Sequence, residues 1–152
     1  MSKVARASRN ASLMRVETIT AAKTIASAES GEVYFLGTPN TEVTLPALKA
    51  GAYFKFIVSA TLQNNADLLR IVSPNGGMEG MALVEAKAGS THTANVTSTV
   101  ASHLVFKVTS SANASNGVHA GSTVEIYCDG SVWHVKADLL TKGTVTTAFA
   151  AS

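Results

Sequence analysis

The chain of 152 residues is poor in cysteine, proline and charge. Cys128 is its single cysteine, so no disulfide can form within the chain and a disulfide scaffold is excluded. No apolar run approaches the roughly 18 residues that a membrane-spanning helix needs. Charged residues make up 14% of the chain, against about 25% in an average soluble domain, and small residues predominate. A surface of this composition suits broad contact with other proteins.

The first 15 residues contain no acidic residue. They carry four cations, Lys3, Arg6, Arg9 and Arg15, whereas the other eight basic and all ten acidic residues follow them. The chain therefore divides into a basic N-terminal arm, residues 1–15, with a charge of +4, and a single β domain, residues 16–152, with a charge of −2. A chain of this length can bury a stable hydrophobic core without the help of disulfides or metal ions. The arm lacks the apolar segment of a secretory signal, although its Arg- and Ser-rich composition is similar to that of mitochondrial transit peptides.

Short alternating segments separated by turn residues predict an all-β domain. Residues 53–58 alternate, with Phe54, Phe56 and Val58 on one face, and residues 104–108 repeat the pattern. Further strands are predicted at 32–36, 42–45, 68–72, 81–85 and 91–97, between turn clusters at 37–40, 73–77 and 87–90. We expect an antiparallel β-sandwich or barrel, jelly-roll-like in arrangement. Residues 109–121 are too polar to pack and predict a long surface loop.

Residues 122–138 predict a hairpin around a two-residue turn at Asp129-Gly130. In that register the core face pairs Cys128 with Ser131, Ile126 with Trp133, and Val124 with Val135. The solvent face then pairs Tyr127 with Val132, Glu125 with His134, and Thr123 with Lys136. We therefore expect Trp133 and Ile126 to pack against each other inside the domain.

The sequence contains no convincing catalytic, cofactor or metal site. The four histidines, His92, His103, His119 and His134, lack zinc-ligand spacing. Glu125 and His134 are interpreted as cross-strand neighbours rather than an acid–base pair, and Cys128 as a buried, inert thiol. Gly76-Gly77 lacks the context of a phosphate loop and indicates a turn. The chain is therefore expected not to be an enzyme.

The basic arm is the best candidate for a binding element. An acidic protein surface is the expected partner, with Lys3, Arg6, Arg9 and Arg15 as the contacts. Nucleic acid is a weaker alternative, because the arm has no aromatic residues for base stacking. A merely solvated tail is the third reading.

Two adjacent segments carry a resemblance to a known group of proteins. They are Ser30-Gly-Glu-Val-Tyr-Phe-Leu36 and Val43-Thr-Leu-Pro-Ala-Leu-Lys-Ala-Gly-Ala-Tyr-Phe-Lys-Phe-Ile-Val58. With the small size and the basic arm, they make the chain resemble bacteriophage capsid decoration (cement) proteins, small β-rich structural proteins of tailed-phage virions. The pattern spans roughly residues 30–58 and is shared with β modules of phage tail fibres.

The resemblance implies a structural protein on the outer surface of the virion's capsid. Its partner would be the major capsid protein, whose neighbouring subunits it would clamp, and it would form a homotrimer. The strand-like tail either closes a sheet or adds to a neighbour's edge, with Val145, Thr147 and Phe149 as the expected oligomer contacts. The alternative is a tail-fibre or receptor-binding β module with carbohydrate as its candidate ligand.

Overall fold

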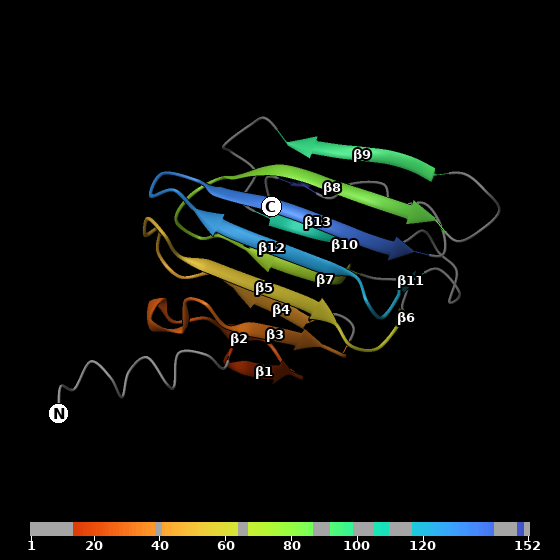
Figure 1. Cartoon of the computed structure of the whole chain (residues 1–152), viewed down its shortest axis with the longest axis horizontal. Helices are drawn as coiled ribbons and strands as arrows, with labels where there is room; N and C mark the ends of the chain where they lie inside the picture. The colour runs from red at the N-terminus through yellow and green to blue at the C-terminus, as the bar shows by residue number, and fades with distance from the viewer. Residues whose placement is uncertain are drawn as a thin grey trace, which may run out of the picture.

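The computed structural model describes residues 14–38, 41–63, 67–86, 92–98, 105–109, 117–141 and 149–150. This part of the chain is almost entirely β, in two sheets with one short 3-10 turn, η1 (Ser27–Glu29) (Figure 1). The larger sheet contains β1 (Val16–Ile19), β3 (Val33–Leu36), β5 (Tyr53–Val58), β6 (Leu62–Gln63), β8 (Met78–Ala86), β9 (His92–Ser98), β11 (Gly117–Val118), β12 (Thr123–Cys128) and β13 (Trp133–Thr141). The smaller sheet contains β2 (Lys23–Thr24), β4 (Thr41–Thr44), β7 (Asp67–Val72), β10 (Val105–Thr109) and β14 (Phe149–Ala150).

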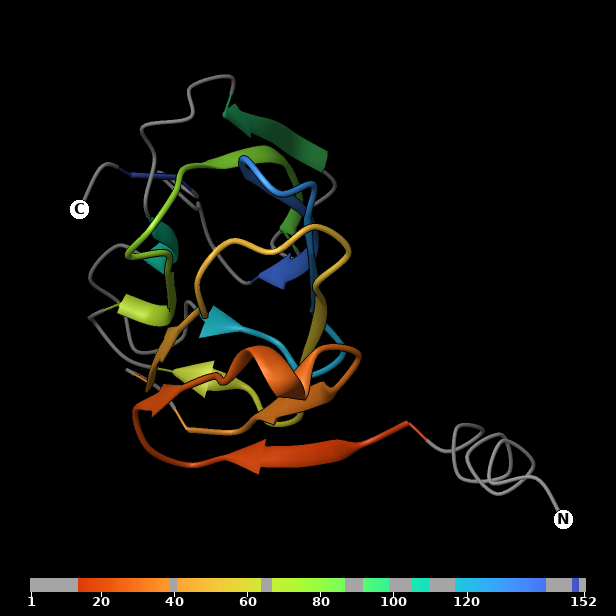
Figure 2. The same cartoon turned by 90° about the vertical axis from the view of Figure 1, so that its left-hand side faces the viewer.

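Side chains from both sheets share one hydrophobic core. The predicted inward face of β5 is confirmed, since Phe54, Phe56 and Val58 are buried. Val43 and Ile71 of the smaller sheet belong to the same cluster. Figure 2 shows the sheets from one end, with β7 and β10 (yellow-green and teal) on one side and β13 (blue) on the other. Burial of this apolar surface is the main stabilising contribution to such a domain.

The first five strands alternate between the two sheets. β1, β3 and β5 pair in parallel in the larger sheet, and β2, β4 and then β7 pair in parallel in the smaller one. Each strand of one sheet thus supplies the crossover between parallel strands of the other, a role that a helix usually fills. The expected purely antiparallel arrangement is therefore wrong: the sheets are mixed.

The β12–β13 hairpin forms, but its register differs by two residues from the predicted one. Cys128 lies opposite Trp133 and Ile126 opposite Val135, while Glu125 lies opposite Lys136 rather than His134. A shift of two preserves which residues face the core, so both faces were assigned correctly within the strands. Trp133 and Ile126 are both fully buried in the core. The indole of Trp133 lies against the ring of Phe54, with the ring centroids 5.9 Å apart, and Phe54 is the register partner of Ile126.

The turn chemistry explains this shift. The carboxylate of Asp129 accepts hydrogen bonds from the backbone N–H groups of Ser131 (2.7 Å) and Val132 (2.9 Å). The side chain thereby stabilises a four-residue connection, an Asx-type turn, in place of the tighter two-residue turn. Gly130 has a φ of +105° within this connection, which favours glycine.

The central pairing of the larger sheet joins segments far apart in the sequence. β13 pairs in parallel with β8 from Trp133 opposite Met78 to Thr141 opposite Ala86. At Gly80 the backbones of β8 and β13 lie very close together, because a Cβ added there would be 1.8 Å from the carbonyl oxygen of Val135. A glycine is therefore required at this position of β8.

Several sequence predictions have definite outcomes elsewhere in the fold. The predicted strands are found as β3, β4, β7, β8, β9 and β10, with shifted ends. The predicted surface loop 109–121 is wrong in part, because Thr109 ends β10 and Val118 is buried in β11. Among the residues described, no helix is long and apolar enough to cross a membrane.

Candidate partner-binding surfaces

The root of the basic arm is attached to the edge of the larger sheet. Val33 donates a backbone hydrogen bond to the carbonyl oxygen of Arg15 (2.8 Å), which holds Arg15 at the start of the β1–β3 pairing. The guanidinium of Arg15 lies 3.3 Å from a carboxylate oxygen of Glu32, although its side chain is 76% exposed. The other expected arm contacts, Lys3, Arg6 and Arg9, lie outside the described residues. The structure thus fixes the position of Arg15, the last residue of the arm, at this edge of the sheet.

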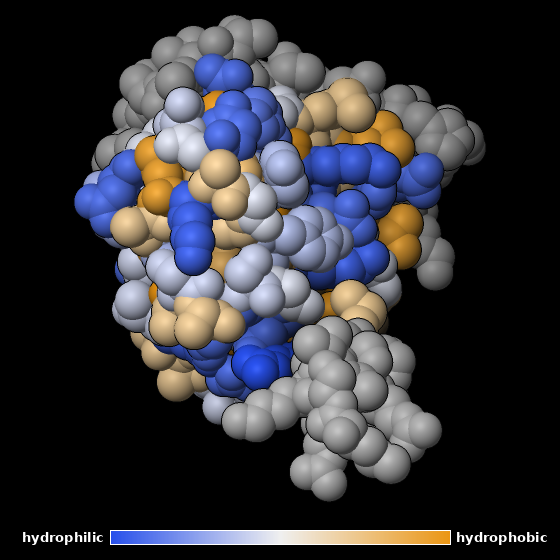
Figure 3. Space-filling model, turned by 60° about the vertical axis from the view of Figure 1, so that its left-hand side comes forward, coloured by the Kyte–Doolittle hydropathy of each residue, from blue (hydrophilic) through white to orange (hydrophobic). Residues whose placement is uncertain are grey.

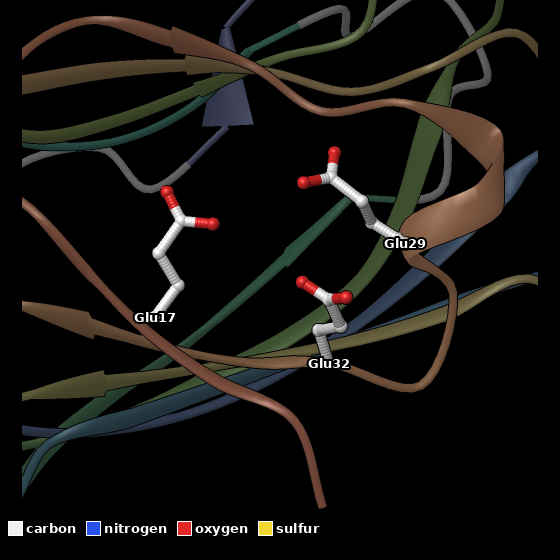
Figure 4. Close-up of side chains that lie close together, drawn as sticks. All are labelled: Glu17, Glu29 and Glu32. Atoms are coloured by element: carbon white, nitrogen blue, oxygen red, sulfur yellow. The ribbon is translucent and has the colours of Figure 1, made fainter.

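Beside this root, an ionic cluster covers the end of the core at β1 and β2. The Lys23 ammonium contacts carboxylates of Glu17 and of Glu29 (2.9 Å), and it lies 5.1 Å from the ring centroid of Tyr34. Tyr34 is fully buried, and its hydroxyl donates to Glu32 (3.3 Å). Figure 4 shows Glu17, Glu29 and Glu32 converging from separate segments. These charged side chains lie between the buried ring of Tyr34 and solvent, at the β1 edge of the larger sheet.

Protonation preferences in the cluster follow from these contacts. Burial by itself would lower the pKa of Lys23, but the hydrogen bonds to Glu17 and Glu29 raise it above its ordinary value. The Lys23 contact and the Ala26 backbone N–H lower the pKa of Glu29. Burial, reinforced by the charges of Glu29 and Glu32, raises the pKa of Tyr34. Lys23 is therefore held in its charged form and Glu29 as a carboxylate near neutral pH, while the Tyr34 hydroxyl stays neutral.

The same three glutamates have the geometry of a metal-ligand set. One carboxylate oxygen from each of Glu17, Glu29 and Glu32 lies within 4.8 Å of the corresponding oxygens of the other two. However, Lys23 contacts two of these carboxylates and Arg15 contacts the third. The charges are thus largely balanced by side chains of the chain itself. We interpret the cluster as an ionic cap of the core.

A second surface is the outer face of the larger sheet, formed by residues that alternate with the core residues along β5, β12, β13 and β8. The strand registers order them in rows across the sheet. The rows are Tyr53, Tyr127, His134 and Glu79; then Lys55, Glu125, Lys136 and Met81; then Ile57, Thr123, Asp138 and Leu83; and last Leu140 and Glu85.

The first row of the outer face is aromatic. Tyr53 lies opposite Tyr127, which is 49% exposed, and Tyr127 lies opposite His134. His134 is held by Asp129 at 3.0 Å. The Ser131 backbone N–H, followed by His134 and the Val132 N–H, lowers the pKa of Asp129 to about 2. The row is thus a partly exposed aromatic strip whose imidazole is held by an ionised carboxylate.

The second row alternates in charge. The Lys55 ammonium lies 2.9 Å from a carboxylate oxygen of Glu125, which also faces Lys136 across the strands. The bond from Lys55 lowers the pKa of Glu125 and raises that of Lys55, and Lys136 acts on Glu125 in the same direction. Glu125 therefore lies between two lysines, bonded to Lys55 and facing Lys136 across the strands.

The last two rows border a shallow hollow of about 260 Å³. It is lined by Leu83, Glu85, Gly121, Asp138, Leu139 and Leu140. Leu83 and Leu140 are 39% and 42% exposed, so apolar surface remains open at its rim. Figure 3, turned by 60° from Figure 1, shows a surface on which hydrophilic side chains predominate and apolar ones form separate patches.

The expected oligomer contacts divide between described and undescribed residues. Phe149 is buried, and it pairs with Phe106 of β10 in the chain's own smaller sheet. Of the two alternatives for the tail, its described part therefore closes a sheet of its own chain. Val145 and Thr147 lie outside the described residues.

Other candidate residues of the sequence have ordinary surroundings. Cys128 is fully buried, as expected. His119 has its Nδ1 at 3.5 Å from the hydroxyl of Thr61, whereas the side chains of His92 and His103 lie outside the description. Sequence reasoning missed the Lys23 cluster, because only the parallel pairing of β1 with β3 brings Glu17 beside Tyr34. No spacing pattern in the sequence indicates it.

The chain was also compared with known proteins. No family model matches it, and no curated protein or solved structure is significantly similar to it. Its surfaces therefore carry the functional interpretation.

Proposed function

We propose that the chain is a capsid decoration protein, a non-enzymatic structural component of a phage virion that binds the outer capsid surface and clamps neighbouring subunits of the major capsid protein. The observation that carries the proposal is the basic arm rooted at a defined edge of a charge-poor β domain. Arg15 links the two parts through Glu32 and through the backbone of Val33. The resemblance of residues 30–58 to phage structural proteins points the same way.

In the proposed mechanism the folded body supplies a rigid base and the arm supplies reach. A protein that binds only the assembled shell stabilises that shell by mass action. An arm that crosses onto a neighbouring subunit adds contact area without enlarging the domain. Many copies, each with weak contacts, add avidity. Each exposed ion pair of the arm contributes only about 0–1 kcal/mol, so the effect of its four cations is collective.

The proposal has a direct binding test. The full chain and a variant lacking residues 2–13 are added to capsids of the phage that encodes it, from which the protein has been removed. We expect the full chain to restore regular density on the capsid and the variant to bind much more weakly while remaining folded. Retaining Arg15 in the variant leaves the ionic cap intact. Equal occupancy by the two proteins would contradict the role of the arm.

We also propose that the two sheets face each other as a β-sandwich and that the protein acts as a homotrimer. Support for the sandwich comes from the shared core of Val43 and Ile71 with the residues of the larger sheet. The parallel pairs do not fit a jelly roll, which is built from antiparallel strands. Light scattering of the free protein tests the trimer.

A receptor-binding β module is the second candidate function, and one observation favours it. The row of half-buried Tyr53 with exposed Tyr127 and His134 provides flat aromatic surface beside charged hydrogen-bonding groups. Sugar rings present C–H faces and hydroxyls that match such a strip. A glycan array with the full chain and its Tyr127→Ala variant tests this: binding that the variant loses would support the module, and an array without signal would contradict it.

A further inference from the structure

The hollow on the outer face of the larger sheet combines apolar and acidic groups at its rim. Exposed Leu83 and Leu140 stand beside the carboxylates of Glu85 and Asp138. With a volume of about 260 Å³ and an open shape, it is small for an organic cofactor. It suits one or two side chains of an extended segment with mixed apolar and cationic character.

The charges of this hollow are left uncompensated by the described side chains. Asp138 and Glu85 form no ion pair among them, whereas Lys136, the neighbouring cation of β13, faces Glu125. The basic arm has the complementary composition. Its cations Lys3, Arg6 and Arg9 are interspersed with Val4 and Leu13, and it contains no acidic residue. Opposite charge on the two surfaces favours their association and sets its specificity.

The root of the arm determines which copy can supply it. Arg15 continues the line of β1, with its carbonyl bonded to Val33 and its side chain to Glu32. β1 is parallel to β13, and Val16 lies in the same row of the sheet as Lys136. Arg15, which precedes Val16, therefore lies toward the end of the sheet opposite to Leu140. An arm of the same copy would have to reverse direction and cross β3, β5 and β12. The arm of a second copy needs no such reversal.

We propose that the hollow at Leu83, Glu85, Asp138 and Leu140 binds the basic N-terminal arm of a second copy of this chain. This deepens the proposed function, on which it rests for the role of the arm as a partner-binding segment, by naming a partner. An arm and a hollow on different parts of the surface make a heterologous contact, which closes into a ring when the rotation between copies allows it. The copies would thus be linked to one another on the shell.

Photo-crosslinking of the full chain in solution tests the proposal. p-Benzoylphenylalanine replaces Leu83, and equal amounts of unlabelled and ¹⁵N-labelled copies are mixed before irradiation. We expect cross-links from position 83 to peptides within residues 1–15, about half of them joining one labelled and one unlabelled peptide. The same probe at Ala47, an exposed residue between β4 and β5, is the control and should give no arm cross-links.

Charge variants separate specific binding from chance encounter. Glu85→Gln with Asp138→Asn should reduce the arm cross-links about three- to tenfold, the range expected for two exposed ion pairs. Both residues are exposed, so the variant should keep the circular dichroism of the parent. Cross-links that are absent, that join only peptides of equal isotope content, or that the charge variant leaves unchanged would overturn the proposal. Because no capsid is present, this result is independent of the capsid-binding test.

Discussion

Replacing Gly80 with alanine should disrupt the parallel pairing of β8 with β13. An added Cβ would lie 1.8 Å from the carbonyl oxygen of Val135, and 2.7 and 2.8 Å from its carbonyl carbon and nitrogen. All three atoms belong to the backbone, so no side-chain rotation can relieve the contact. Gly80 also has a φ of +152°, which side-chain-bearing residues rarely adopt. The two strands must therefore move apart locally.

The size of the effect follows from what has to move. Overpacking that side chains can absorb costs about 1–3 kcal/mol. Here the backbone must shift within a register that runs from Met78 opposite Trp133 to Ala86 opposite Thr141. We therefore expect Gly80→Ala to lower the free energy of unfolding by at least about 3 kcal/mol, a large part of the roughly 5–15 kcal/mol of a typical domain.

Gly51→Ala is the matched control for this substitution. Gly51 has a φ of +83°, but a Cβ there meets no atom within 4 Å. Its replacement should cost about 1–2 kcal/mol, the strain of a left-handed conformation alone. Urea unfolding followed by the fluorescence of Trp133 measures both variants. Equal destabilisation by the two substitutions would refute the close approach of Gly80 to Val135.

Three further predictions concern the core, the turn and the ionic cap. Trp133→Ala should lower the free energy of unfolding by about 3–5 kcal/mol, because the indole is fully buried; a loss below about 1 kcal/mol in thermal or urea unfolding would contradict that burial. The pKa of Asp129 is lowered from 3.8 to about 2, so its stabilising contribution is present above pH 4 and is lost as the pH falls toward 2. Wild type should therefore lose stability more steeply than Asp129→Asn over that interval in urea titrations, and parallel pH curves would refute this. Lys23→Met leaves Glu17 and Glu29 without their shared cation, beside the carboxylate of Glu32, and should cost about 1–3 kcal/mol at neutral pH. Adding Glu17→Gln should restore part of that loss in chemical unfolding, and a double variant no more stable than Lys23→Met would count against the cap.

The local structure could be predicted from the sequence wherever one strand carries its own pattern. The alternation in residues 53–58 gave the core face of β5, and the β12–β13 hairpin gave both its strands and their faces. The predicted register of that hairpin was wrong by two residues, because the carboxylate of Asp129 stabilises a longer turn than Asp129-Gly130 alone indicates. Local pattern therefore determined the faces, and side-chain turn chemistry determined the register.

Long-range pairing could not be predicted in the same way. The parallel partners β1–β3, β4–β7 and β13–β8 are separated by whole strands of the other sheet or by long stretches of sequence. Alternating hydrophobicity is similar for parallel and antiparallel strands that have one buried face, so the pattern does not distinguish them. The ionic cap at Lys23 and the hollow at Leu83 depend on these pairings. Sequence patterns therefore could not predict either site, whereas the charge of the arm follows directly from its composition.

Imaging of intact virions by cryo-electron microscopy tests the proposed capsid role most directly. In particles of the phage that encodes this chain, the proposal predicts density matching the two-sheet body at regular positions on the outer capsid surface. It also predicts a connection from the β1 edge, at Arg15, to a neighbouring subunit. A capsid without such density, with the chain found in a tail fibre instead, would contradict the decoration role and favour the receptor-binding module.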